Sequence, residues 1–424
     1  MLEIKFIREH PEKVKVGLKK KGVEFDVDHL LAVDEKRRVK TKEVDDLRAE
    51  QNRLNIEIEK LNRDETRTQF TLKVIESKAL KAKLGDAEPE LKALDTEFEE
   101  LMQHVPNLPL ADVPDGGAEA NQVVREVGEK PRFDFKPKDY LEIAEALDLI
   151  DMERGAKVAG SRFGYLKREA ALLEFALVRY AFDTLLPEGF IPVVPPVMLR
   201  GEHFRAIGRI PPGQEEERYF LPFDNLYLAG SAEHTLAPMH ADEVLGADAL
   251  PLRYLGFSTC FRREAGSYGK DTRGILRVHQ FDKVEMFSFV RAEDGEPELE
   301  RMVAWQEKLM RGLGLPYRVV LIAAGDMGWP EAKLYDIETW LPGEGTYRET
   351  HSASTTTDFQ ARGTNTRYRT TSGEIEFAHT LNATAFPIGR TVIAILENYQ
   401  QEDGSVAVPE ALRPYMHEIR EIRR

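Results

Sequence analysis

The sequence has a single cysteine, Cys260, among 424 residues. One thiol cannot close an internal disulfide or build a cysteine-rich zinc site. The chain has no run of about 18 apolar residues, and its first residues, MLEIKFIREHPEKVK, lack the apolar core of a signal peptide. It also has no glycine-rich P-loop and no dinucleotide fingerprint. These absences predict a cytoplasmic protein without a membrane segment, and they argue against nucleotide binding of the Walker or Rossmann kind.

The sequence also has fewer basic than acidic residues, which gives a formal net charge of −15. Such a balance argues against indiscriminate binding of nucleic acid driven by bulk charge, although local basic patches can coexist with an acidic whole. Hydrophobic residues make up 42% of the chain, which is ordinary for a globular protein. A length of 424 residues predicts two or three domains.

The first 110 residues have a pattern of their own. Apolar residues fall at heptad positions in two runs, separated by the polar stretch NRDETRTQ (62–69). This pattern predicts a projecting antiparallel coiled-coil hairpin over about 28–105, within an N-terminal domain of residues 1–110; two helices of an ordinary bundle are the alternative. Pro89 is expected to start a new helical turn or to kink the second arm. The heptad residues are Leu30, Val33, Val44, Leu47, Leu54, Ile58 and Leu61, then Leu84, Ala87, Leu91, Leu94, Phe98, Leu101 and Val105.

Charge on this hairpin is uneven. At its root, Lys36, Arg37, Arg38 and Lys40 are expected to face the acids of residues 95–100, so those charges neutralise one another. The outer half has a basic surplus without such partners, which a phosphate backbone could contact. Its cations are Lys60, Arg63, Arg67, Lys73, Lys78, Lys81 and Lys83.

The proline-rich stretch VPNLPLADVPDGG (105–117) ends the coiled coil and forms a linker. Residues 111–424 then read as one catalytic-sized domain, with strand-like stretches in succession and helical segments at both ends. This order predicts an α+β fold in which helices flank an antiparallel β-sheet.

The segment FRREAGSYGKDTRGILRVHQFDKVEMF (261–287) is rich in arginine and lies between two expected strands. Arg262 and Arg277, joined by Arg390 from a later helix, would clamp a polyphosphate, because guanidinium forks match phosphate oxygens and keep their charge. Phe281 could stack on a base. The acids Glu264, Glu285 and Glu349 fit magnesium or a cationic group of a second substrate; surface ion pairs on a strand are the structural alternative.

These motifs resemble those of class II aminoacyl-tRNA synthetases, specifically the bacterial seryl-tRNA synthetases, over essentially the whole chain. GFIPVVPPVM (189–198) resembles the first motif of the class, and the segment from Cys260 to Phe287 resembles the second. AFPIGRTVIAILENYQQEDGSVAVPEALRPYM (385–416) resembles the third, with its arginine at Arg390. DFQARGTNTRYR (358–369), GDMG (325–328) and the N-terminal hairpin are typical of the seryl enzymes.

The resemblance implies a function. Such an enzyme activates L-serine with ATP and Mg²⁺ to seryl-adenylate, then transfers serine to the 3′ end of tRNA(Ser), and also of tRNA(Sec) where that is present. The hairpin would hold the variable arm of the tRNA, with Arg63, Lys78 and Lys81 among its contacts. The first-motif region would form a homodimer.

The resemblance also implies site residues. Arg262, Glu264 and Arg390 would be catalytic, and Glu349 and Ser352 would hold the metal. The ATP site would comprise Arg262, Arg263, Glu264, Arg277, Val278, Phe281, Glu349, Thr350, His351, Ser352 and Arg390. The serine site would comprise Ser231, Ala232, Glu233, Arg262, Glu285, Asn382 and Thr384.

Four positions depart from the family pattern. Arg263 stands where serine is common, Ser231 replaces threonine, and His234 replaces an aliphatic residue. NATAFPIGR (382–390) is bulkier than the usual glycine- and serine-rich turn. Single histidines are more often structural than catalytic, so no proton transfer is assigned to them.

Two other functions compete with this one. A related ligase could load a small amino acid onto a carrier protein, but such enzymes lack the hairpin and hold zinc with cysteine. A non-enzymatic RNA-binding paralogue would be expected to have lost Arg262, Arg390 or Glu285, and all three are present.

Overall fold

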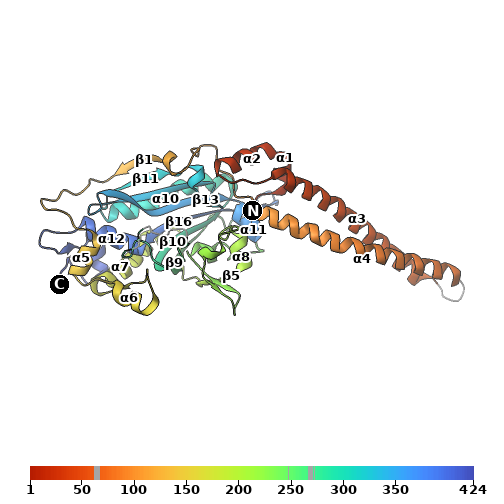
Figure 1. Ribbon diagram of the computed structural model, residues 1–424. Coiled ribbons are helices and arrows are strands. Elements are labelled where there is room, and N and C mark those ends of the chain that lie inside the picture. Colours follow the sequence, from red (N-terminus) through yellow and green to blue (C-terminus); the bar gives the residue numbers. More distant parts are fainter. Residues whose placement is uncertain (62–66, 247, 266–270, 272) are drawn as a thin grey trace. The chain divides into compact units, whose positions relative to one another are not determined.

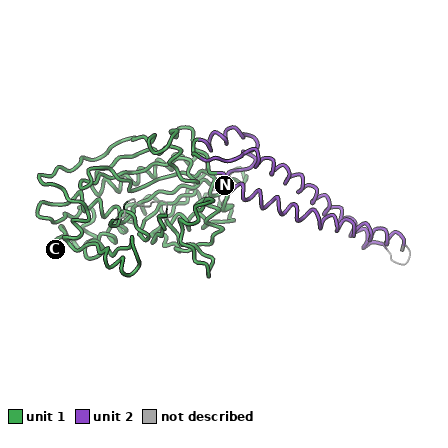
Figure 2. The backbone as a smooth tube through the Cα atoms, in the orientation of Figure 1, with its two compact units in different colours: residues 1, 20–22, 106–424 green, residues 2–19, 23–105 purple. Residues whose placement is uncertain are grey.

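A computed structural model describes residues 1–61, 67–246, 248–265, 271 and 273–424. The chain divides into two compact units (Figure 2). The smaller unit comprises residues 2–19 and 23–105, and the larger comprises residues 1, 20–22 and 106–424.

The smaller unit is built around two long helices, α3 (Val27–Lys60) and α4 (Arg67–Gln103), which pair along their length as the heptads predict (Figure 1). The shorter helices α1 (Ile4–Glu9) and α2 (Pro11–Lys20) precede them. The Asp26 side chain caps α3 by accepting a hydrogen bond from the backbone N–H of His29 at 2.9 Å. Heptad residues including Val44, Leu54 and Ala87 are buried in the seam. The predicted antiparallel hairpin is therefore confirmed.

Ion pairs join the two helices at the root. Arg37 pairs with Asp95 at 2.8 Å, and Lys40 pairs with Glu90 at 2.7 Å. Arg38 instead pairs with Glu35 of its own helix. Arg37 thus pairs with an acid of residues 95–100 as predicted, whereas Lys40 pairs with Glu90 and Arg38 with its own helix. The predicted neutralisation is found in part.

The outer half differs from the prediction at one residue. Lys73 pairs with Glu57 of the opposite helix at 2.5 Å, so the expectation that it lacks a partner is wrong. Lys78 and Lys81 are exposed and form no ion pair with any described residue. Arg63 lies outside the described residues.

Pro89 sits inside α4 without ending it. Its side chain is exposed, and the helix is assigned without interruption from Arg67 to Gln103. Proline lacks the N–H that donates to the preceding turn. The missing donor therefore does not end α4 at this position.

The larger unit is organised by an eight-stranded sheet in the order β1-β11-β12-β13-β16-β10-β9-β4. Neighbouring strands are antiparallel except for β4 and β9, which are parallel. This sheet confirms the predicted fold class. Its strands are β1 (Gln122–Val127), β4 (Ile191–Val193), β9 (Leu252–Phe261), β10 (Gln280–Val290), β11 (Tyr317–Leu321), β12 (Lys333–Leu341), β13 (Thr346–Thr357) and β16 (His379–Pro387).

Helices pack on this sheet and enclose the main core. The buried core cluster joins apolar residues of α7 (Arg168–Leu185), α10 (Gly295–Gly312) and α12 (Ile388–Asn398) to sheet residues such as Val284, Met286 and Leu381. The other helices of this unit are α5 (Tyr140–Ala146), α6 (Met152–Ala159), α8 (Gly201–Ala206), α9 (Glu233–Leu236) and α11 (Phe359–Thr364).

Small sheets complete the unit. One joins β5 (Met198–Arg200), β7 (Leu226–Leu228) and β6 (Phe220–Leu221), and another joins β15 (Ile375–Phe377), β14 (Arg367–Arg369) and β8 (Val244–Leu245). Two-stranded pairs join β2 (Ile150–Asp151) to β3 (Tyr165–Leu166) and β17 (Val406–Ala407) to β18 (Glu421–Ile422). Among the described residues, no helix is both long and apolar enough to cross a bilayer.

Strand β10 shows how the sheet positions a site. Side chains of a strand alternate between the two faces, so Val284 and Met286 enter the main core while Phe287 and Phe289 enter a second buried cluster. Glu285 lies on the same face of β10 as Phe287 and Phe289. It is nevertheless a charged residue at 1% exposure, which requires partners to compensate for its burial.

Candidate active site

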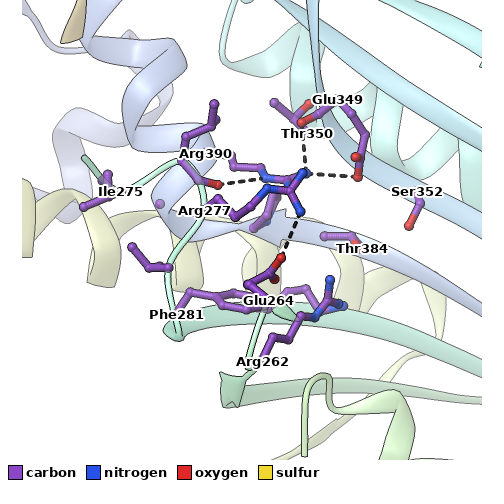
Figure 3. Close-up of a pocket in the computed structure, with 15 residues that line it drawn as sticks. Arg262, Glu264, Ile275, Arg277, Phe281, Glu349, Thr350, Ser352, Thr384 and Arg390 are labelled. Atoms are coloured by element: carbon purple, nitrogen blue, oxygen red, sulfur yellow. Dashed lines mark hydrogen bonds and ion pairs between the residues drawn. The ribbon is translucent and has the colours of Figure 1, made fainter. Parts of the chain in front are cut away.

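Three arginines from separate segments line one pocket (Figure 3). Arg262 follows the end of β9, Arg277 precedes β10, and Arg390 lies in the first turn of α12. The sheet brings the first two together because β9 and β10 are paired neighbours. Helix α12 begins where β16 ends, beside β10. The convergence predicted from the sequence is therefore present in the structure.

Each of two arginines is oriented by a carboxylate. Arg277 donates from Nη1 to Oε2 of Glu264 at 2.9 Å, and Arg390 donates from Nη1 to Oε1 of Glu349 at 2.9 Å. The Arg390 guanidinium lowers the pKa of the Glu349 carboxyl. Glu264 has a φ of 53°, a left-handed conformation that non-glycine residues adopt at a cost and that recurs at functional sites.

Arg262 and Phe281 lie together on the floor of the pocket. The guanidinium of Arg262 is 5.3 Å from the centroid of the Phe281 ring, a cation–π distance. Arg262 also donates from Nε to the carbonyl of Gly230 at 3.2 Å. An aromatic face and a permanent cation are thus available to one ligand.

A second cavity adjoins the first. Ser231, Glu233, Glu285 and Asn382 line it. Both cavities share Arg262 and several of its neighbours as lining residues. Two ligands could therefore meet at Arg262, one in each cavity.

Cross-strand pairing orients Glu285, which lines the second cavity, whereas the predicted serine-site residue Thr384 lines the first pocket. Glu285 of β10 faces Thr384 of β16, whose hydroxyl donates to Glu285 Oε2 at 3.2 Å. Lys283 pairs with the same oxygen at 2.6 Å. Burial raises the pKa of Glu285 and the Lys283 ammonium opposes that rise. An anion, a cation and a hydroxyl are therefore in contact where the two cavities adjoin.

Side chains whose oxygen atoms could bind a metal ion lie on β12 and β13. Ser352 faces Asp336 across the pair, and Glu349 lies nearby on β13. Burial raises the pKa of Asp336 well above its ordinary range, and the neighbouring Glu349 carboxylate adds to this rise. Magnesium prefers few protein carboxylates, with waters and substrate phosphates completing its shell. Glu349 and Ser352 line the first pocket and suit such an ion, whereas Asp336 lines neither cavity. Among the described residues no cluster of three acid, histidine or cysteine ligands forms.

Most predicted ATP-site residues line the first pocket, including Val278, Thr350 and Ser352. Two do not. The Arg263 guanidinium lies 5.7 Å from the Tyr219 ring. His351 is 1% exposed and its Nδ1 hydrogen-bonds the Thr350 hydroxyl at 2.8 Å.

His351 is buried because of a bulge in β13. The register shifts so that Ile337 faces His351 and Glu338 faces Glu349, which leaves Thr350 as the extra residue. Burial lowers the pKa of His351 to about 3. The imidazole is therefore neutral and packs under the pocket.

Ala232, predicted to belong to the serine site, is buried and lies outside the lining of both cavities. The unusual His234 is also buried, and its Nδ1 accepts a hydrogen bond from the Gly230 N–H at 2.9 Å. Burial, with nearby arginines, lowers the pKa of His234 well below its ordinary range. His234 thus supports the turn that carries Ser231.

Sequence reasoning missed several residues that line the second cavity, among them Lys283 and Arg209. Lys283 could have been predicted, because it lies two residues from both Phe281 and Glu285 and so shares their face of β10. Arg209 lies in a loop after α8. No local pattern marks it.

Each of the two units contains a match to a known protein family. Residues 1–109 match the family described as the seryl-tRNA synthetase N-terminal domain, and residues 221–399 match the class II tRNA synthetase core domain (G, H, P, S and T). A serine–tRNA ligase of Thermobifida fusca is 45% identical over 418 residues, covering 98% of this chain and 97% of the relative. A serine–tRNA ligase of Dictyoglomus turgidum is 45% identical over 427 residues, covering 100% of this chain and 99% of the relative.

A solved structure is similar in both sequence and fold. It is a seryl-tRNA synthetase from Pyrococcus horikoshii complexed with ATP, with a TM-score of 0.90 and 39% identity. The match covers 100% of this chain and 99% of that one.

Proposed function

Because the chain belongs to the seryl-tRNA synthetases, we propose that its two cavities carry out the two substrate-binding tasks of a serine–tRNA ligase. ATP would occupy the arginine-lined pocket and L-serine the adjoining cavity. The convergence of Arg262, Arg277 and Arg390 beside the Glu285 cavity carries this proposal. The acceptors would be tRNA(Ser) and, where present, tRNA(Sec).

The ATP-site roles follow from charge and shape. Arg277 and Arg390 would hold the phosphate tail of ATP, because their forks match phosphate oxygens. Phe281 would stack on adenine. Arg262, which borders both cavities, would bridge the α-phosphate and the serine carboxylate.

Serine-site roles follow from the three polar groups of serine. Its ammonium needs an anion, and Glu233 and Glu285 provide carboxylates. Its carboxylate needs a cation, which Arg262 supplies. Ser231, Asn382 and Thr384 add neutral donors and acceptors. A site that hydrogen-bonds the hydroxyl should reject alanine, since its buried partners would be left unpaired.

The chemistry requires no protein nucleophile. The serine carboxylate attacks the α-phosphorus of ATP and pyrophosphate leaves, while the arginines stabilise the negative charge that develops. The terminal ribose hydroxyl of tRNA then attacks the carbonyl carbon of the adenylate and AMP leaves. Magnesium, held by Glu349 and Ser352 with Asp336 nearby, would neutralise phosphate charge when bound.

Serine-dependent ATP–pyrophosphate exchange tests the proposal. We expect exchange with serine, about 10⁴-fold less with alanine because the hydroxyl is missing, and about 10²-fold less with threonine because of its extra methyl group. Equal exchange with alanine would contradict the serine site. Failure of exchange with all three amino acids would contradict the proposed activity.

The outer hairpin is proposed to bind the tRNA variable arm. Lys78 and Lys81, with Lys83, are exposed cations on α4. Each phosphate neutralised by a cation releases counterions, so changing the three lysines to glutamine should lower the salt slope of tRNA binding by about two to three units. Affinity measured at several salt concentrations gives this slope.

A matched control uses Arg37, Lys40 and Arg48, which pair across the seam. Changing these three to glutamine should act weakly and mainly on stability, because exposed pairs contribute about 0–1 kcal/mol each. A larger loss of slope in the control variant would locate the RNA at the root of the hairpin.

The first-motif region is proposed to form a homodimer. Ile191, Val194 and Met198 are exposed by 45%, 81% and 45%. Apolar side chains exposed together are typical of interaction surfaces. A second copy of the chain would remove them from water.

The carrier-protein alternative has little support. Residues 1–109 match the tRNA-synthetase hairpin domain, which such ligases lack. Cys260 is fully buried on β9, and burial raises the pKa of its thiol. It is therefore poorly placed to serve as a zinc ligand in either cavity.

A further inference from the structure

Arg209 is buried in the serine cavity between two carboxylates. It follows α8 in the chain, and only 16% of its side chain is exposed. Its Nη2 and Nε donate to Oε1 of Glu233 at 2.7 and 2.9 Å. Its Nη1 donates to Oε1 of Glu331 at 2.5 Å. One guanidinium thus offsets two buried negative charges.

The contacts on Glu233 are concentrated on one oxygen. Besides the two donors of Arg209, Nε2 of Gln360 donates to the same Oε1 at 2.8 Å. Oε2 accepts no hydrogen bond from the described residues, while Glu233 lines the cavity. A carboxylate held this way has one oxygen fixed by the protein and one free for a ligand.

The backbone around Glu331 is held in place by Lys21. Lys21 donates from Nζ to the carbonyls of Gly328 and Glu331 at 2.7 and 2.6 Å, and burial lowers the pKa of Lys21 to about 8. Glu331 is 5% exposed, and its Oε2 is buried without a hydrogen-bond partner. The turn that presents Glu331 is therefore ordered, and Arg209 is bound at both ends of its fork.

We propose that Arg209 is a positioning residue for amino-acid recognition: it fixes the Glu233 carboxylate with Oε2 presented to a hydrogen-bond donor of the bound serine. This inference rests on the proposed function of the cavity. Without the guanidinium, Glu233 and Glu331 would repel each other across a buried space, and Glu233 would keep only Gln360 to orient it. Arginine suits this role because it cannot lose its charge and its fork fixes geometry.

The test compares Arg209→Gln, Arg209→Lys and the unchanged protein in ATP–pyrophosphate exchange. For Arg209→Gln we expect KM for serine to rise by about 10- to 100-fold, the loss that follows removal of a charge-assisted contact, with KM for ATP unchanged. Arg209→Lys keeps the charge but not the fork, so KM for serine should recover in part. The double variant Arg209→Gln with Glu331→Gln restores the charge balance around Glu233 and should also recover in part.

Arg253→Gln provides a matched control. Arg253 is also 16% exposed, and it forks onto the buried Glu298 at 2.6 and 2.8 Å outside both cavities. Its loss should lower the melting temperature without a selective change in KM for serine. The inference is overturned if Arg209→Gln raises both KM values together, or changes serine KM no more than Arg253→Gln does. If the unchanged protein shows no serine-dependent exchange, the proposed function itself fails.

Discussion

Arg262→Ala is expected to lower serine-dependent ATP–pyrophosphate exchange by about 10²–10³, the usual cost of removing one charged donor from a transition-state site. The effect should be large because Arg262 lines both cavities and would contact the carboxylate that attacks and the phosphate that is attacked. Its loss also removes the contact with the Phe281 ring. Initial rates at saturating serine and ATP measure the change.

Arg311→Ala is the control for this variant. Arg311 lies on α10, is 57% exposed and pairs with Glu307 at 3.2 Å, so its removal deletes a guanidinium away from both cavities. Exchange should then be close to that of the unchanged protein. Exchange by a folded Arg262→Ala variant at the level of Arg311→Ala would remove Arg262 from the proposed chemistry.

Shortening the hairpin is expected to separate amino-acid activation from tRNA charging. Residues 49–87 can be replaced by a short glycine-rich turn, because Arg48 and Glu88 face each other at 2.8 Å across the seam. Exchange should remain largely intact, since every lining residue of both cavities lies in the larger unit. Charging of tRNA should fall by about 10³, the equivalent of two or three charge-assisted contacts at about 1.5–3 kcal/mol each.

The shortened protein is measured with two assays on one preparation. Pyrophosphate exchange reports the pocket, and transfer of serine to tRNA reports the arm. A shortened protein that exchanges and also charges tRNA at the full-length rate would show that the outer hairpin does not bind RNA. Loss of both activities would indicate a folding defect, which a comparison of melting temperatures would detect.

Local patterns explain why much of the fold could be predicted from the sequence. Heptad spacing identifies the α3–α4 seam because residues such as Val44 and Ala87 must face the partner helix to leave water. Alternation identifies β10, since Val284 and Met286 enter one core and Phe287 the other. Both patterns have a period set by the backbone, so they can be read before any tertiary contact is known.

The convergence of the three arginines on one pocket was predictable for a different reason. Arg262, Glu264 and Arg277 occur together in one segment, and long ordered motifs tie that segment to Arg390. Lys283 was equally accessible, because it shares a strand face with Phe281 and Glu285.

The sequence by itself determined the hairpin and the antiparallel α+β fold, because periodicity is a property of neighbouring residues, and its ordered motifs predicted that Arg262, Arg277 and Arg390 line one pocket. Only the tertiary structure decided two finer points. The bulge at Thr350 lets Glu349 and Ser352 line one pocket while His351 is buried, against the strict alternation of a regular strand. Arg209 meets Glu233, Glu331 and Gln360 through chain segments far apart in sequence. Such contacts have no period, so only the folded chain reveals them.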